Sequence, residues 1–122
     1  MLANTALTPD TKALMGEAQF AAMKPGAGFI NMARGELVDQ PALEKALRSG
    51  KLSCALIDVT SPEPLPKEST LYDAPNLIIT PHVLSDDIDQ YVPRTLDIFF
   101  DNIRRHIAGE PLRNAVDRER GY

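Results

Sequence analysis

Three polar side chains of different chemistry follow three apolar stretches of the sequence. Arg34 follows AGFINMA, Glu63 lies in the loop after SCALIDV, and His82 follows NLIITP. A guanidinium group binds a carboxylate through two parallel hydrogen bonds. An imidazole titrates near neutral pH, and it can donate a proton to a carbonyl oxygen or take one from a hydroxyl group. A carboxylate beside the imidazole would favour its charged form and fix its ring. These residue types predict proton transfer on a small carboxylic acid.

Each of these residues also has a simpler interpretation when it is taken alone. Arg34 could cap the end of a strand or pair with Glu36, His82 could be an ordinary loop histidine, and Glu63 could be a solvated loop charge. The chemical interpretation therefore requires the fold to bring the three side chains together.

The sequence offers no obvious group to attack a carbonyl carbon. No serine stands in a nucleophile-elbow pattern, and His, Cys and Asp residues do not show metal-ligand spacing, so we expect no metal site. The other histidine, His106, lies far along the last helical segment, and Cys54 stands among apolar residues that are typical of a core. We therefore expect a cofactor to supply the attacking group as a hydride.

Helical and extended patterns alternate along the chain. Extended segments are expected at 27–32, 53–59 and 76–80, with a possible further strand at 2–6, and helices at 16–23, 39–50 and about 86–108. In the second helix, Asp39 is the expected N-cap and Gly50 follows the end. Pro93 predicts a kink or a restart in the third. The alternation predicts an α/β fold with a parallel sheet. The carboxyl ends of such strands share one edge, so Arg34, Asp58, Glu63 and His82 should lie there.

Composition excludes several classes of protein. The 122 residues carry a net charge of −4, whereas a nucleic-acid-binding surface needs a basic excess. The arginines of the tail alternate with acidic residues and predict a solvated mixed surface. A single cysteine excludes an internal disulfide and fits a reducing compartment. No segment has the pattern of a signal peptide or the length of a membrane span, so we expect a cytoplasmic protein.

The motifs resemble those of the D-isomer-specific 2-hydroxyacid dehydrogenases. The matching stretches are LTPDT at 7–11, MKPGAGFINMARGELVD at 23–39, ALEKALRSGKL at 43–52, IDVTSPEPLP at 57–66 and PNLIITPH at 75–82. They cover the C-terminal half of the NAD(P)-binding domain, which is a Rossmann-like fold. The closing IAGEPL and VDRERGY are most similar to glyoxylate/hydroxypyruvate reductases.

The resemblance implies a role for each motif residue. Arg34 would bind the carboxylate of a 2-oxo or 2-hydroxy acid, His82 would be the general acid and base, and Glu63 would hold and tune His82. Asp58 would contact the nicotinamide carboxamide of NAD or NADP. The remaining cofactor-lining positions would be Thr5, Met32, Ala33, Leu84 and Ser85, together with Arg34 and His82. Two positions depart from the family pattern, namely Ala6, where proline is common, and Leu84, where a small residue is usual.

The family's glycine-rich phosphate loop, ribose-binding acidic residue and substrate-binding lid domain have no counterpart in the sequence. The nearest glycine pattern, GAG at 26–28, precedes a strand and predicts a turn. We therefore expect residues 1–122 to form one partial NAD(P)-binding domain, with a tail at 109–122, that binds NAD(P) weakly and turns over little by itself. An unpaired sheet edge and uncovered apolar faces predict a homodimer or another form of self-association. The alternative is a non-catalytic binding or interaction module of dehydrogenase-like fold.

Overall fold

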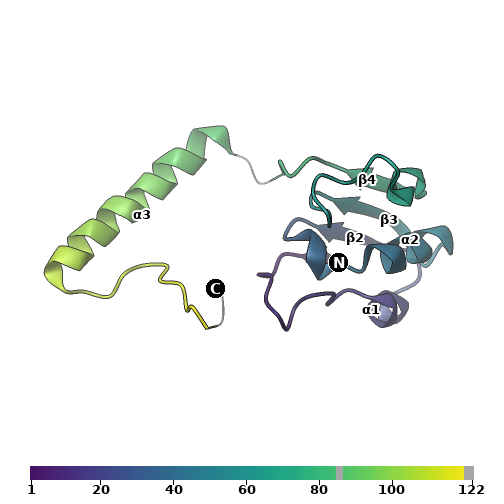
Figure 1. Cartoon of the computed structure of the whole chain (residues 1–122), viewed down its shortest axis with the longest axis horizontal. Coiled ribbons are helices and arrows are strands. Elements are labelled where there is room, and N and C mark those ends of the chain that lie inside the picture. Colours follow the sequence, from purple (N-terminus) through teal and green to yellow (C-terminus); the bar gives the residue numbers. More distant parts are fainter. Residues whose placement is uncertain (85–86, 120–122) are drawn as a thin grey trace. The chain divides into compact units, whose positions relative to one another are not determined.

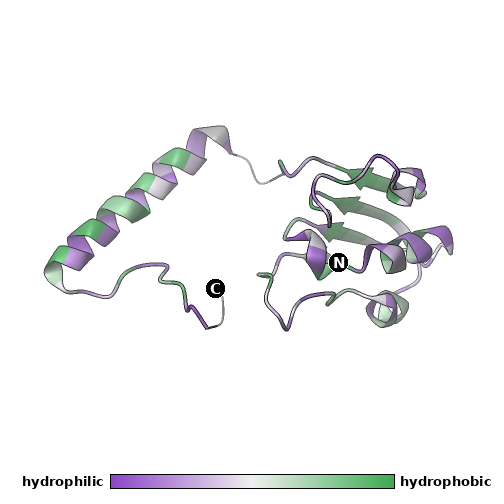
Figure 2. Cartoon of the chain, in the orientation of Figure 1, coloured by the Kyte–Doolittle hydropathy of each residue, from purple (hydrophilic) through white to green (hydrophobic). Residues whose placement is uncertain are grey.

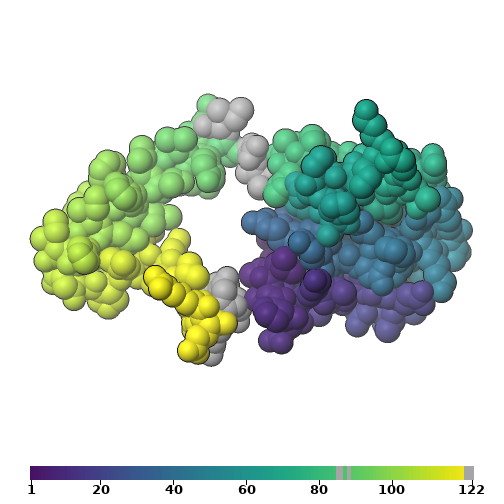
Figure 3. All heavy atoms as spheres, in the orientation of Figure 1, coloured from purple at the N-terminus to yellow at the C-terminus, as the bar shows by residue number. Residues whose placement is uncertain are grey.

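The computed structural model describes residues 1–84 and 87–119. The chain divides into two compact units, Met1–Leu84 and Ser85–Tyr122 (Figure 1). The atoms of the first unit, coloured from purple to teal, form one closely packed body (Figure 3). All of the site residues predicted from sequence belong to this first unit except Ser85, which lies outside the described residues.

The first unit is built on a parallel sheet of four strands in the order β1-β2-β3-β4. The strands are β1 (Leu2–Ala3), β2 (Ala27–Asn31), β3 (Leu52–Ile57) and β4 (Leu77–Ile79). Each neighbouring pair is parallel, so the strands point the same way and end at a common edge (Figure 1). The predicted α/β fold is confirmed, and the possible strand at 2–6 is present as the short β1.

Two α-helices and two short 3-10 helices connect the strands. They are α1 (Glu17–Ala22), η1 (Gly35–Leu37), α2 (Gln40–Arg48) and η2 (Thr70–Asp73). The N-cap of α2 is as predicted, because the Asp39 carboxylate accepts a hydrogen bond from the Ala42 amide at 3.1 Å. Gly50 follows the helix with a φ of 73°, which favours glycine.

The core lies on one face of the sheet. Strand register aligns Ala3, Asn31 and Ile57 in one row and Phe29 with Ala55 in another. All five side chains are buried. The helices cover this face: the ring of Phe20 in α1 packs edge-on against Phe29 with centroids 5.2 Å apart. The apolar stripe of α2 is buried as expected and consists of Ala42, Leu43, Ala46 and Leu47.

The opposite face of the sheet remains open in this unit. Strand register aligns Leu2, Ile30, Leu56 and Ile78 across the four strands, and we call this set the open-face row. Leu2 is 55 % exposed and Ile78 is 59 % exposed. Cys54 is also exposed. Its prediction as a core residue is therefore wrong, because the strand is apolar on both sides while the unit covers only one.

The second unit contains α3 (Ile88–Ala108) and the segment after it. The helix continues through Pro93, so the restart expected there is absent, while the alternative of a kink stays a prediction. Apolar and polar residues alternate along it (Figure 2). It ends at Gly109, which has a φ of 69°. Most of its described apolar side chains are exposed, among them Phe99 and Ile103, while Ile98 is half-buried.

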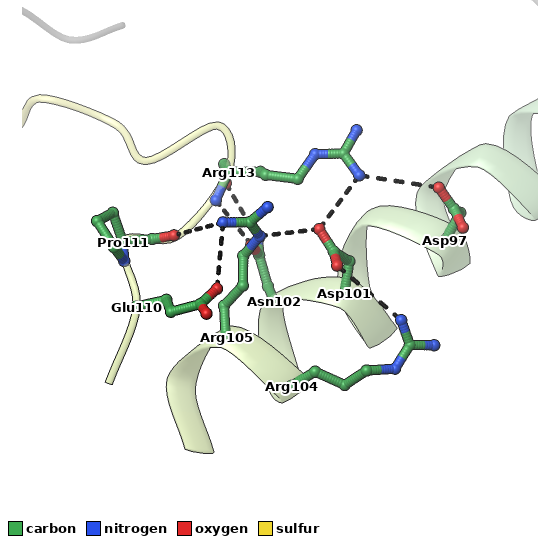
Figure 4. A network of polar contacts seen from close by, with 8 residues as sticks. All are labelled: Asp97, Asp101, Asn102, Arg104, Arg105, Glu110, Pro111 and Arg113. Atoms are coloured by element: carbon green, nitrogen blue, oxygen red, sulfur yellow. Dashed lines mark hydrogen bonds and ion pairs between the residues drawn. The ribbon is translucent and has the colours of Figure 1, made fainter. Parts of the chain in front are cut away.

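A polar network ties the segment after α3 to the helix (Figure 4). The Asp101 carboxylate accepts hydrogen bonds from Arg105 at 3.0 Å and from Arg113 at 3.3 Å, and these bonds lower its pKa despite the opposing effect of desolvation. The Asn102 side chain pairs with both backbone groups of Arg113. The end of α3 and the tail therefore carry the mixed charges that their composition predicted, and the structure shows that several of them are paired.

Candidate active site

The predicted contact between Glu63 and His82 is present. The Nδ1 atom of His82 lies 2.8 Å from Oε1 of Glu63, and the two side chains are 41 % and 42 % exposed. The residues reach each other because Glu63 lies in the loop after β3 and His82 follows β4, the neighbouring strand. With Nδ1 engaged, Nε2 is the ring nitrogen left to exchange a proton with a substrate.

Asp58 follows β3 directly and is one of the few buried charged or polar residues in the described chain. Its Oδ1 accepts hydrogen bonds from the Thr80 hydroxyl at 2.6 Å and the Val83 amide at 2.9 Å, and its Oδ2 accepts one from the Leu84 amide at 3.0 Å. Burial by itself raises the pKa of this carboxyl group. The hydrogen bonds and the nearby His82 outweigh burial, so the pKa lies below its ordinary value.

The loop that carries Arg34 is held by the buried side chain of Asn31. Its Nδ2 donates to the Arg34 carbonyl at 3.0 Å, and its Oδ1 accepts from the Ala33 amide at 3.1 Å. The guanidinium group is exposed and donates to the Ala33 carbonyl at 2.7 Å. Within the described part of the chain it forms no ion pair, so the alternative pairing with Glu36 is not present. Arg34 therefore has donors free for an anionic ligand.

The Arg34 loop packs tightly on the loop that leads to Glu63. A Cβ atom on Gly35 would overlap the carbonyl group of Thr60, so only glycine fits there. Next to this contact, the amide side chain of Gln40 bonds both backbone groups of Ser61, with each distance 2.8 Å. The structure thus joins Glu63 to His82 directly and packs the Arg34 loop against Thr60 and Ser61, which lead to Glu63.

Sequence reasoning missed the uncharged polar residues that support these loops. Asn31 and Thr60 are buried, and the Thr60 hydroxyl donates to the Pro62 carbonyl at 3.0 Å, just before Glu63. Thr80 is half-buried against Asp58. The signal that could have found them is a polar side chain at the end of an apolar strand, where it must have a partner.

A pocket of about 650 Å³ opens beside the pair of Glu63 and His82. Its polar side is formed by these two residues with Asp58, Thr60 and Thr80, and its apolar side includes Leu65, Leu71 and Ile79. The volume falls in the range of small-molecule sites, about 300–1,000 Å³. Among the described residues, no cluster of His, Cys, Asp or Glu could hold a metal ion. Within the described part of the chain, no helix is long and apolar enough to span a membrane.

Comparison with known proteins supplies the family. Residues 1–83 match the model described as D-isomer specific 2-hydroxyacid dehydrogenase, NAD binding domain. The chain belongs to this family. A D-isomer specific 2-hydroxyacid dehydrogenase from Xanthobacter autotrophicus Py2, solved in complex with NADPH and MES, is 46 % identical with a TM-score of 0.88, covering 99 % of this chain and 49 % of that one.

Curated members of the family are similar over most of the chain. A glycerate dehydrogenase of Methylorubrum extorquens is 43 % identical over 91 % of this chain and 35 % of its own length. The human glyoxylate reductase/hydroxypyruvate reductase is 40 % identical over 87 % of this chain and 32 % of its own length. The chain therefore spans about a third of the length of these 2-hydroxyacid dehydrogenases.

The cofactor-lining positions expected from the family motifs lie at the carboxyl ends of the strands. Thr5 follows β1 and is exposed, and the Met32 amide donates to the Ala3 carbonyl at 3.3 Å, which ties the ends of β1 and β2 together. Ala33 is buried, while Leu84 is exposed next to Asp58. The GAG segment at 26–28 lies at the opposite ends of the strands, where β2 begins, so it offers no phosphate loop at the site.

Proposed function

We propose that the chain is part of a reductase that transfers a hydride between NADH or NADPH and a small 2-oxo acid, of the glyoxylate or hydroxypyruvate type. The observation that carries the proposal is the 2.8 Å contact of Glu63 with His82 at the strand edge where the Arg34 loop also lies. The names of the relatives support the substrate class, since they include glyoxylate/hydroxypyruvate reductases.

Each side chain has a defined task in this proposal. Arg34 binds the carboxylate of the 2-oxo acid with its free donors, which orients the substrate and polarises its carbonyl group. His82, held through Nδ1 by Glu63, donates the proton on Nε2 to the carbonyl oxygen during reduction. It takes the proton back from the hydroxyl group in the reverse direction. The dinucleotide supplies or accepts the hydride when it is bound.

The described residues fit one end of such a cofactor. One acceptor position of Oδ2 on Asp58 remains open to the amide of a nicotinamide ring, because a carboxylate oxygen can accept two hydrogen bonds and Oδ2 accepts one. Pyrophosphate binding in dinucleotide-binding domains relies on a glycine-rich loop before a helix N-terminus, and the described residues contain no such loop at this edge of the sheet. We therefore propose that the 122-residue chain binds NAD(P) weakly and has little activity by itself. We also propose that the chain is cytoplasmic and that it self-associates.

The function is tested in the complete reductase that contains this sequence, with glyoxylate, hydroxypyruvate and bulkier 2-oxo acids against NADH and NADPH. His82→Ala is expected to lower kcat by about 100- to 10,000-fold, the usual contribution of a general acid. Arg34→Ala is expected to raise the KM of the oxo acid by about 10- to 100-fold, with Arg34→Lys between it and the unaltered enzyme. His106→Ala is the matched control on α3. Normal turnover in His82→Ala would exclude the proposed acid.

The weak affinity of the isolated chain is a separate expectation. NADH is titrated into the 122-residue chain by calorimetry or fluorescence, and no saturation is expected in the micromolar range. Micromolar affinity would show that the nicotinamide end alone anchors the cofactor, and it would contradict this part of the proposal.

A further inference from the structure

The buried Asp58 carboxylate accepts hydrogen bonds from residues that come before and after His82 in the chain. The Thr80 hydroxyl lies two residues before His82, and the Val83 and Leu84 amides follow it directly. Asp58 is 2 % exposed, so little solvent reaches the carboxylate to replace these donors. The carboxylate thus joins the end of β3 to the segment after β4.

The segment from Thr80 to Leu84, which is hydrogen-bonded to Asp58, has an unusual backbone conformation at His82. Its φ is 57°, in the left-handed region that residues other than glycine rarely adopt. Such a conformation persists only where the surroundings impose it. Donors before and after His82 converge on a single carboxylate, so these hydrogen bonds hold the chain in the turn between Thr80 and Val83.

We propose that Asp58 and Thr80 are positioning residues for His82, because their hydrogen bonds fix the turn that aims the imidazole at Glu63 and at the substrate. This inference rests on the proposed function and adds to it a role that differs from a cofactor contact. Oδ1 already accepts two hydrogen bonds, so this oxygen is fully used inside the protein. The lowered pKa of Asp58 supports the role, since the carboxylate is then charged whenever the enzyme works.

The two roles of Asp58 predict different kinetics. A residue that only contacts the cofactor would affect mainly the KM of NAD(P)H, whereas a residue that aims His82 affects kcat. Thr80 separates them, because its hydroxyl reaches Oδ1, the oxygen that is already saturated. Thr80→Val removes this hydroxyl and keeps the shape of the side chain, while Thr80→Ser keeps the hydroxyl.

The matched control is Thr70, whose hydroxyl also donates to a carboxylate at 2.6 Å, that of Glu44. In the complete reductase, Thr80→Val is expected to lower kcat about tenfold or more, as for the loss of a hydrogen bond to a charged group. The KM values for NAD(P)H and the oxo acid should change less than about twofold. Thr80→Ser should restore most of kcat, and Thr70→Val should leave it unchanged.

A second measurement on the 122-residue chain needs no activity. In its NMR spectrum, Thr80→Val is expected to shift the ring and backbone signals of His82, while those of His106 stay in place and Thr80→Ser changes little.

If the valine variant does not fold, amide hydrogen exchange in the unaltered chain tests the inference instead. The amides of Val83 and Leu84 should be protected while the Asp58 carboxylate is charged, and they should lose protection when acid protonates it. Unshifted His82 signals with unchanged kcat, or amides without protection, would overturn the inference. Shifted signals in a chain whose complete reductase reduces no oxo acid would contradict the proposed function alone.

Discussion

Each loop of the candidate site has a buried polar residue at its base. Asn31 holds the loop of Arg34, Thr60 holds the segment before Glu63, and Asp58 holds the segment around His82. These are the buried polar residues of the described chain. Buried polar groups are costly unless they are bonded, so their positions show where the fold maintains a fixed loop geometry.

The charged residues of the site could be predicted from sequence, whereas their uncharged supports could not. Arg34, Glu63 and His82 stand out because ionisable side chains at the ends of apolar stretches require an explanation. Asn31 and Thr80 lie within similar stretches, but an amide or a hydroxyl group there is consistent with many local roles. Their partners are set by strand pairing, which determines that the end of β3 meets the segment after β4.

Asp58 makes the stability of the first unit depend on pH. Its pKa is lowered by folding, so its contribution is fully present above the unfolded value of about 3.9 and is lost as the pH falls through the lower folded value. Asp58→Asn is expected to cost about 1–3 kcal/mol of unfolding free energy at neutral pH. The variant should also lose less stability on acidification than the unaltered chain. Urea unfolding between pH 2 and pH 7 measures both effects, and parallel curves would contradict the role of the carboxylate.

Asn31 offers a test of the Arg34 loop. Asn31→Asp removes the donor to the Arg34 carbonyl and places a negative charge beside it. In the proposed reductase we expect the KM of the oxo acid to rise about tenfold, with a smaller change in kcat, because Arg34, the proposed substrate clamp, is displaced and His82, the proposed proton donor, is not. Asn114→Asp makes the same charge change at an exposed position and should leave both constants unaltered.

At the level of elements, local signals predicted α2 well. Asp39 and Gly50 determine its ends through contacts within a few residues, so no tertiary information is needed. The β3–β4 connection was less predictable, since η2 and the proline-rich loop take their shape from contacts such as that of Gln40 with Ser61.

The capping contact of α2 can be tested directly. Asp39→Ala is expected to destabilise the first unit by about 1 kcal/mol, because the Ala42 amide loses its acceptor. Asp39→Ser retains an oxygen that can accept this bond and should recover most of the loss. The midpoints of thermal unfolding of the three chains, measured by circular dichroism, provide the comparison, and equal midpoints would exclude a capping role.

The contact between the two site loops depends on Gly35. Gly35→Ala would force the backbone of Thr60 and Ser61 away, so we expect a loss of about 1–3 kcal/mol in unfolding free energy and a raised KM for the oxo acid. Gly16→Ala is the control, since a Cβ there would lie 3.5 Å from Gln19, an ordinary contact, and should cost less than about 1 kcal/mol. Similar losses in the two variants would mean that the close approach of the loops is not the cause.

At the scale of the whole molecule, the strands carry more apolar surface than the first unit covers. Parallel sheets normally have helices on both faces, and their strands are apolar throughout for that reason. The sequence therefore predicted burial for Cys54, although its face of the sheet is open in this unit. Strand composition indicates that a face is meant to be covered, but it does not identify the segment or the partner that covers it.

The open-face row makes self-association of the 122-residue chain a specific expectation. Exposed apolar side chains such as Ile30 and Ile78 lie in one row across the sheet, and burying them against a second copy would remove them from water. Sedimentation should therefore show an average mass that rises with concentration, and Ile78→Glu should shift the chain toward the monomer. Val116→Glu makes the same change at a tail position that is 66 % exposed, outside the sheet, and should leave the association unaltered. A monomer at every concentration, or equal effects of the two substitutions, would show that the open face of the sheet does not drive assembly.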